Sequence, residues 1–266
     1  MKKQTPLLLA PLLLACGFYF AGPVSAATLV SQYTFAGNAN DSVGGKNLTV
    51  TGSVGYGTQT INGVSMNVVT ISEPSNSNYL NFSGNLGASL GSVSVSFWAN
   101  GTATGATYKD IVGVANGSGV GFKLETFNDF SSNDYVAVYG MGSFLTGAPP
   151  GTSVGSEGAW HLYTFTVNGT AATLYCDGVA VGTATTNGNN TLITQLRVGN
   201  GLDSTGRGWL GSVADLKIYS GALTAGEVAA AYAAVPEPTT YGMLGAGALA
   251  GAALVRRRRR RGVIAR

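Results

Sequence analysis

The chain has 266 residues, of which 10% are charged and 40 are glycine, and its formal net charge is +3 at pH 7. That positive charge lies at the two ends, because Lys2, Lys3, Arg256–Arg261 and Arg266 are nine of the fifteen basic residues. Residues 27–234 carry six basic and eleven acidic side chains, a balance of about −5. An acidic body without a basic cluster argues against nucleic acid and anionic lipid as partners.

Residues 1–26 are predicted to be a signal peptide for Sec-type export. Two lysines precede the apolar run Leu7–Leu14, and Val24-Ser25-Ala26 has the small-x-small pattern that a signal peptidase accepts. The apolar run is too short to span a membrane comfortably. An alternative cut before Cys16 resembles a lipoprotein box, but the apolar residues that follow Cys16 favour cleavage after residue 26.

The body of the chain, residues 27–234, is predicted to be all-β, a two-sheet antiparallel sandwich. Short runs of alternating apolar and polar residues recur between turn residues, and helix-period patterns are nearly absent. The predicted strands, in chain order, are Leu29–Phe35, Asn67–Ile71, Tyr79–Phe82, Ser92–Trp98, Asp110–Val114, Gly119–Thr126, Tyr135–Tyr139, Trp160–Val167, Ala172–Asp177, Val179–Ala184, Leu192–Val198 and Gly208–Tyr219.

Local signals in the body mark two turns and one helix. Asn168-Gly169 and Asp177-Gly178 lie between alternating runs, and both central residues of such turns can take positive φ, which predicts two hairpins. Thr224 and Glu227, three residues apart, form a capping box, in which each residue satisfies a backbone donor of the other. The capping box predicts a short helix at the end of the body.

The residues after the body are predicted to form a membrane-coupled tail. Val235-Pro236-Glu237-Pro238 is stiff and extended, because each proline fixes its own φ and restricts the preceding residue. Residues 239–255 contain no charge and are predicted to be a single transmembrane helix. The arginine-rich segment 256–266 stays cytoplasmic under the positive-inside rule. The motif at 235–238 is therefore expected at the outer face of the membrane.

This order of proline motif, apolar span and arginine run closely resembles the PEP-CTERM sorting signal. The resemblance covers about the last thirty residues, 235–266. It implies processing by an exosortase near the motif, after which the protein reaches the cell surface or the extracellular space. The alternative is a plain C-terminal anchor with a polybasic stop-transfer segment.

The body resembles the laminin-G-like, concanavalin A-like jelly-roll family. The residues that carry the resemblance occur in family order: Tyr33-Thr34-Phe35, Asn40–Gly45, Val93–Trp98, Trp160–Thr166, Leu174–Gly178, Gly211–Tyr219, Ala222-Leu223-Thr224 and Glu227-Val228. The resemblance implies a jelly-roll sandwich, but it does not imply one function, because function depends on sites and not on folds.

No catalytic constellation is evident, and the body is predicted not to be an enzyme. Glycosidases on this sandwich place paired carboxylates on one strand, whereas no glutamate of the body has an acidic neighbour two residues away. His161, the only histidine, shares a strand face with apolar residues and is predicted to be structural and hydrogen-bonded. Cys176 is predicted to be a buried, inert thiol, and zinc is not expected with one histidine and one cysteine in the body.

The family resemblance implies a structural Ca²⁺, held by an early aspartate loop and an acid in the last strand. The matching residues here are Asp41 and Asp215, and the Asp41 loop offers the hard oxygens that Ca²⁺ prefers. The family usually has two adjacent acids at the second position, where this chain has Ala214-Asp215. The alternative is that Asp41 caps a turn through its own backbone.

Carbohydrate sites combine aromatic platforms with planar polar groups, and one segment of the chain has that composition. The candidate residues are Phe127, Asn128, Asp129, Phe130 and Tyr135. A solvated connecting loop has the same composition, so this alternative stays open. The sequence predicts an exported, non-catalytic surface or matrix protein whose candidate ligand is extracellular polysaccharide. The alternatives are a divergent glycan hydrolase or lyase of the same fold, and a self-associating structural component.

Overall fold

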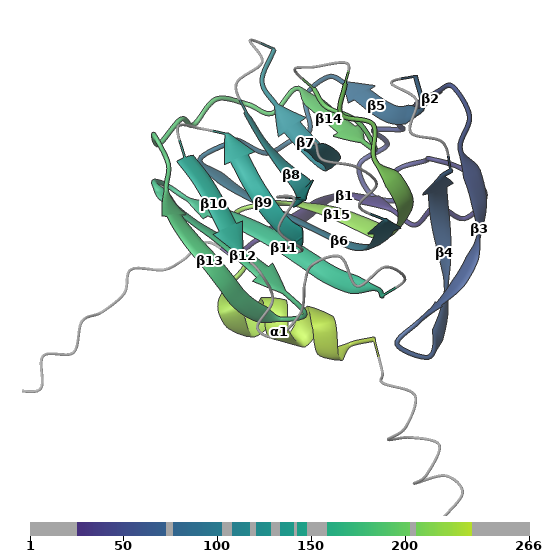
Figure 1. The fold of residues 1–266 in the computed structure, drawn as a ribbon. Helices are drawn as coiled ribbons and strands as arrows, with labels where there is room; N and C mark the ends of the chain where they lie inside the picture. Colours follow the sequence, from purple (N-terminus) through teal and green to yellow (C-terminus); the bar gives the residue numbers. More distant parts are fainter. Residues whose placement is uncertain are drawn as a thin grey trace, which may run out of the picture.

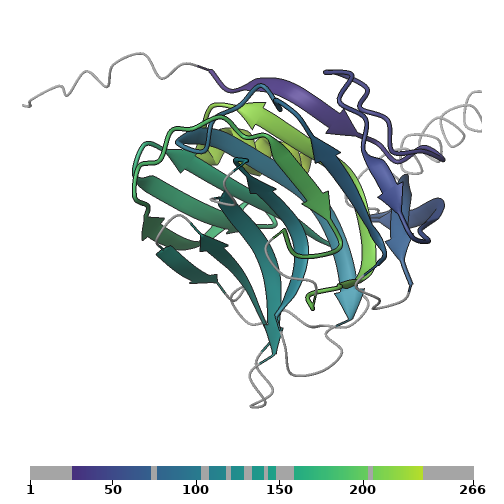
Figure 2. The same cartoon turned by 90° about the horizontal axis from the view of Figure 1, so that it is seen from above.

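The computed structural model describes residues 26–72, 77–102, 108–117, 121–128, 134–140, 143–147, 159–202 and 206–235. These residues form two antiparallel sheets and one short helix (Figure 1). The two curved sheets lie face to face, as the second view shows (Figure 2). The predicted all-β, two-sheet antiparallel fold is therefore confirmed, and the arrangement is consistent with a jelly-roll sandwich.

The first sheet has eight strands in the order β13-β12-β11-β6-β15-β4-β3, with β1 paired to β15. The long strand β15 pairs with β6 along one edge, while β4 and β1 share its other edge. The strands of this first sheet are β1 (Thr28–Tyr33), β3 (Gly55–Ile61), β4 (Val64–Ile71), β6 (Ser92–Thr102), β11 (His161–Asn168), β12 (Ala171–Cys176), β13 (Val179–Thr185) and β15 (Leu210–Ser220).

The second sheet has seven strands in the order β10-β9-β8-β7-β14-β5-β2. Its strands are β2 (Thr49–Thr51), β5 (Tyr79–Ser83), β7 (Lys109–Ala115), β8 (Gly121–Asn128), β9 (Asp134–Gly140), β10 (Ser143–Gly147) and β14 (Gln195–Val198). All twelve predicted strands are present. The sequence reasoning missed β2, β3 and β10. β2 and β10 are short, and two glycines interrupt β3, so pairing with a neighbouring strand defines all three.

The core lies between the two sheets and follows from strand alternation. Val93, Val95 and Phe97 of β6 point inward and are almost fully buried. Phe165 of β11 meets Phe122 of β8 across the sandwich, with ring centroids 4.4 Å apart. Burying each such side chain contributes about 1.5–3 kcal/mol, which stabilises a sandwich that has no disulfide among its described residues.

The helix α1 (Ala225–Ala233) packs on the outer face of the first sheet (Figure 1). The predicted capping box is confirmed, because the Thr224 side chain accepts from the Glu227 backbone and Glu227 accepts from the Thr224 backbone. Tyr232 of the helix lies against Trp98, with ring centroids 5.8 Å apart. This contact forms a second, smaller apolar cluster outside the main core.

The predicted hairpin turns are confirmed at one position and corrected at another. Asp177 and Gly178 both have positive φ (51° and 81°), as predicted. In the other hairpin Asn168 pairs with Ala171, so the turn is Gly169-Thr170, one residue later than predicted, and only the glycine has positive φ. A further asparagine-glycine turn, at residues 62–63, joins β3 to β4.

The predictions about the two ends of the chain lie outside the described residues, apart from their inner boundaries. This applies to the signal peptide at 1–26, to Pro236, Glu237 and Pro238, and to the predicted segments 239–255 and 256–266. Within the described part of the chain, no helix is long and apolar enough to cross a membrane.

Candidate functional site

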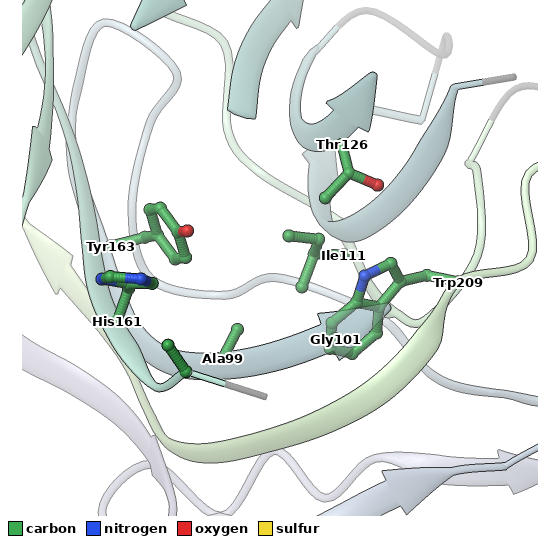
Figure 3. Close-up of a pocket in the computed structure, with 8 residues that line it drawn as sticks. Ala99, Gly101, Ile111, Thr126, His161, Tyr163 and Trp209 are labelled. Carbon is green, nitrogen blue, oxygen red and sulfur yellow. The ribbon is translucent and has the colours of Figure 1, made fainter. Parts of the chain in front are cut away.

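A pocket opens between the two sheets at one end of the sandwich (Figure 3). Both sheets contribute to its wall, and the segment before β15 supplies a tryptophan. The residues that line it are Ala99, Gly101, Ile111, Thr126, Ala159, His161, Tyr163 and Trp209. Its empty volume is about 310 Å³, including the part open to solvent. The part of it that a water-sized sphere can occupy is about 20 Å³, room for about one water molecule.

The pocket exists because the inward side chains of β6 become smaller toward the end of the strand. Phe97 fills the core, whereas Ala99 and Gly101 leave room beside it. A Cβ atom at Gly101 would lie 2.3 Å from Cζ2 of Trp209. Glycine at this position therefore allows the indole ring to lie directly on the strand and to form one wall of the pocket.

Two ring nitrogens of the pocket lining are buried without a hydrogen-bond partner among the described residues. They are Nε1 of Trp209, whose side chain is 1% exposed, and Nε2 of His161. An unsatisfied buried polar group costs about 1–3 kcal/mol, so a ligand or water that pairs with these atoms is favoured. Burial, and then the nearby Cys176 and Asp177, raise the pKa of Tyr163 well above 10.0, so its hydroxyl stays protonated.

Asp177 orients His161 from the β12–β13 turn. Its Oδ2 lies 2.7 Å from Nδ1 of His161, and its Oδ1 accepts a 2.9 Å hydrogen bond from the Leu162 backbone. The prediction of a hydrogen-bonded histidine is therefore confirmed. In the neutral imidazole, a proton on Nδ1 facing the carboxylate leaves Nε2 as an acceptor. The pocket then offers one donor, at Trp209, and one acceptor, at His161.

Cys176 lies next to this pair and is buried, with 3% of its surface exposed. Burial, and then the negative charge of Asp177, raise the pKa of its thiol. The thiol is therefore protonated and a poor nucleophile at neutral pH, as predicted for an inert buried cysteine.

A second group of polar side chains is buried on the outer face of the second sheet. Asp110 of β7 lies opposite Glu125 of β8, and neither side chain is more than 1% exposed. Arg207 contacts Glu125 at 2.8 Å and Asp110 at 3.6 Å, while Lys123 lies 3.6 Å from Asp110 and 3.9 Å from Glu125. The guanidinium of Arg207 also lies over the ring of Tyr108, 5.2 Å from its centroid.

This arrangement shifts the pKa of Glu125. Burial raises the pKa to about 7, with a further contribution from the neighbouring Asp110, while Lys123 and Arg207 act in the opposite direction. The sequence reasoning searched for carboxylates on one strand and missed this pair, because the register of β7 and β8 joins residues fifteen positions apart. The one available signal was charged residues inside otherwise apolar strands.

Asp41, predicted as a calcium ligand, caps a loop in the structure. Its Oδ1 accepts backbone hydrogen bonds from Gln32, Val43 and Gly44 at 2.9–3.0 Å, and its Oδ2 accepts one from Lys46 at 3.1 Å. Burial alone would raise its pKa, but the four backbone donors lower the pKa below 3.8.

Asp215, the second predicted calcium ligand, lies at a β-bulge of β15 and has a positive φ of 47°. Its carboxylate accepts from the Gln32 side chain at 2.7 Å and pairs with the Lys217 ammonium. Gln32 therefore joins Asp41 and Asp215. Backbone donors and an ammonium group occupy these oxygens, which favours the turn-capping alternative, and calcium stays a prediction.

The structure places only part of the predicted carbohydrate segment. Phe127 and Asn128 end β8 directly after Thr126 of the pocket, and Phe127 pairs with Tyr135 of β9. Asp129 and Phe130 lie outside the described residues, as do the side chains of the other three. The backbone therefore places the start of the predicted segment next to the pocket. The sequence alone did not predict the pocket.

Comparisons with known proteins match two parts of the chain to family models. Residues 74–229, more than half of the 266 residues, match the model of the concanavalin A-like lectin/glucanases superfamily. Residues 234–260 match the model of the PEP-CTERM protein-sorting motif. A search of curated proteins found no match.

Solved structures share the fold at low sequence identity. Domain 4 of AbnA, a GH43 extracellular arabinanase from Geobacillus stearothermophilus in complex with arabinotriose, has a TM-score of 0.58 at 20% identity, covering 77% of this chain and 98% of that chain. The binding domain of Paraclostridial Mosquitocidal Protein 1 has a TM-score of 0.58 at 16% identity, with 77% and 52% covered. The receptor binding domain of the botulinum neurotoxin C/D mosaic serotype has a TM-score of 0.53 at 16% identity, with 78% and 51% covered. The match spans about half the length of each of the two toxin chains.

Proposed function

The chain belongs to the concanavalin A-like lectin/glucanases superfamily and carries a PEP-CTERM protein-sorting motif. We propose that it is an exported, non-catalytic surface or matrix protein that binds extracellular polysaccharide. The sorting motif supports export and processing by an exosortase. In this proposal, the apolar segment 239–255 holds the protein in the membrane until that processing, with its arginine tail in the cytoplasm. After it, the sandwich is displayed at the cell surface or released.

The binding part of this proposal is carried by the pocket beside Trp209. The opening is lined by a tyrosine hydroxyl, a donor at Nε1 of Trp209 and an acceptor at Nε2 of His161, the last two without a partner among the described residues. A sugar hydroxyl both donates and accepts hydrogen bonds, so one hydroxyl of a polysaccharide that lies across the opening suits this donor and acceptor. The AbnA domain, which has the same fold, holds a trisaccharide and supports the same ligand class.

A glycan array tests the binding proposal, with Trp209→Phe as the diagnostic variant. The wild-type protein is expected to bind at least one polysaccharide or oligosaccharide on the array. Trp209→Phe keeps an aromatic ring but removes the N–H donor, so affinity is expected to fall by about 3- to 10-fold, the value of one hydrogen bond. Trp98→Phe, on the outer face of the first sheet, is the matched control and should bind as wild type. A blank array with well-folded wild-type protein would contradict polysaccharide binding.

The buried carboxylate pair is the one observation that favours the enzyme alternative, a glycan hydrolase or lyase. Glu125, with a pKa of about 7, and its neighbour Asp110 resemble an acid–base pair that works near neutral pH. Both are covered by Arg207 and its neighbours, so a substrate would have to displace them. Under our proposal, purified wild-type protein releases no reducing ends or unsaturated products from polysaccharides. Release that Glu125→Gln abolishes, in a variant that is still folded at the assay pH, would establish the enzyme instead.

A further inference from the structure

His161, Cys176 and Asp177 form a cluster of three possible metal ligands in the first sheet. β11 and β12 pair antiparallel with Tyr163 opposite Cys176, which brings the beginning of one strand beside the end of the other. The imidazole nitrogen, the thiol sulfur and the carboxylate oxygen all lie within 4.8 Å of one another. This is the one such group of three found in the described part of the chain.

The donor atoms of this cluster suit a thiophilic cation. One nitrogen, one sulfur and one oxygen ligand match the set that Zn²⁺ accepts, whereas Ca²⁺ and Mg²⁺ prefer oxygen alone. Tetrahedral Zn²⁺ with bonds of about 2.0–2.3 Å places its ligand atoms about 3.3–3.7 Å apart. To reach this spacing, the His161 nitrogen and the Asp177 oxygen, now 2.7 Å apart, must separate slightly. Ligand atoms that are now up to 4.8 Å apart must approach one another, so the side chains need to move by about 1 Å.

Two further observations support a metal at this position. The Leu162 backbone donates to Oδ1 of Asp177 at 2.9 Å, and such a contact to a ligand carboxylate fixes its orientation. His161 also lines the pocket, which gives an ion a route from solvent to the cluster. Three protein ligands leave a fourth coordination position for water.

We propose that Nδ1 of His161, the thiolate of Cys176 and a carboxylate oxygen of Asp177 bind a thiophilic divalent cation such as Zn²⁺, with water in the fourth position. On binding, the S–H bond of Cys176 breaks, its proton goes to solvent, and the thiolate sulfur binds the metal. The imidazole loses its proton from Nδ1 and takes one up at Nε2, so that Nε2 donates into the pocket instead of accepting. Zinc was not expected from one histidine and one cysteine, because only the register of β11 and β12 brings His161 to the adjacent Cys176 and Asp177. This site does not depend on polysaccharide binding.

Cobalt titration of the full chain tests the site. The protein is purified without a histidine tag, in a Cys16→Ser background that leaves Cys176 as the sole thiol. After treatment with a chelator, Co²⁺ is expected to produce a thiolate-to-metal charge-transfer band that saturates at one equivalent. Zn²⁺ should then abolish the band by displacing Co²⁺, and it should raise the melting temperature.

Cys176→Ser is the decisive variant, because it changes one buried atom and keeps the hydrogen bond of His161 to Asp177. It should lose the charge-transfer band and the Zn²⁺-dependent rise in melting temperature, while its metal-free melting temperature stays close to that of the parent. His161→Gln should weaken Co²⁺ binding by at least 10-fold. The proposal is overturned if the reduced parent shows no band, or if Cys176→Ser gains the same thermal stabilisation from Zn²⁺.

Discussion

Replacing Asp41 by alanine is expected to lower the free energy of unfolding by about 3 kcal/mol, because it removes the acceptor of four backbone N–H groups. Each donor that remains buried without a partner costs about 1–3 kcal/mol, and water at the loop surface offsets part of that cost. The carboxylate is 8% exposed, so the loop is only partly open to water. Chemical denaturation of wild type and variant at pH 7 measures the difference.

Asp41→Asn should be less harmful, with a loss of about 1–2 kcal/mol. Its amide oxygen can keep the three hydrogen bonds that Oδ1 accepts, while its NH₂ group faces the Lys46 donor and cannot accept from it. Because its folded pKa is lowered, the ionised Asp41 stabilises the protein above the unfolded pKa and loses this effect as the pH falls through the folded value. The difference between wild type and Asp41→Asn should therefore shrink in acid.

Asp215→Ala is the matched control, because two side chains and no backbone N–H in the described structure hold that carboxylate. Its expected loss is about 1 kcal/mol or less, as for a partly exposed ion pair. The same variants test the calcium prediction. A bound Ca²⁺ would raise the wild-type melting temperature, and both variants would lose that rise. A similar loss of stability in the two alanine variants without Ca²⁺ would contradict the turn-capping role of Asp41.

Glu125→Gln is expected to gain stability relative to wild type as the pH rises, by up to about 3 kcal/mol between pH 4.5 and pH 8. The folded pKa of about 7 exceeds the ordinary value of 4.5, because burial and then Asp110 disfavour the ionised form. Between these two values the unfolded chain has lost the proton while the folded protein retains it, so raising the pH favours unfolding. Below about pH 4.5 the group is protonated in both states and contributes no difference.

Glutamine imitates the protonated acid and removes this titration. Denaturation curves of wild type and Glu125→Gln at a series of pH values isolate the effect, because the other titrating groups are shared. Glu227→Gln is a control for which the stability difference should change with pH in the opposite direction. Thr224 holds the pKa of Glu227 below 4.5, so the ionised group stabilises the helix start and the variant loses stability relative to wild type as the pH rises. A stability difference between Glu125→Gln and wild type that does not change with pH would show that Glu125 is ionised throughout.

The sequence by itself determined which segments form strands, where the terminal helix begins, and that a sorting motif follows the body. These features depend on residues close together in the chain. Alternating polarity marks a strand, Asp177-Gly178 closes a hairpin, and Thr224 caps a helix three residues before Glu227. The same locality explains the misses, because glycines interrupt β3 and its pairing with β4 defines it.

Only the tertiary structure decided which polar side chains meet. Strand register places Asp110 opposite Glu125 and brings His161 beside Asp177, and no spacing in the sequence specifies that register. The pocket likewise depends on contact between Gly101 and Trp209, which lie in distant parts of the chain. Long-range pairing is set by the sum of core burial over many strands, whereas a strand or a cap is set by a few neighbouring residues. The strands of this protein are therefore readable in its sequence, and its sites are not.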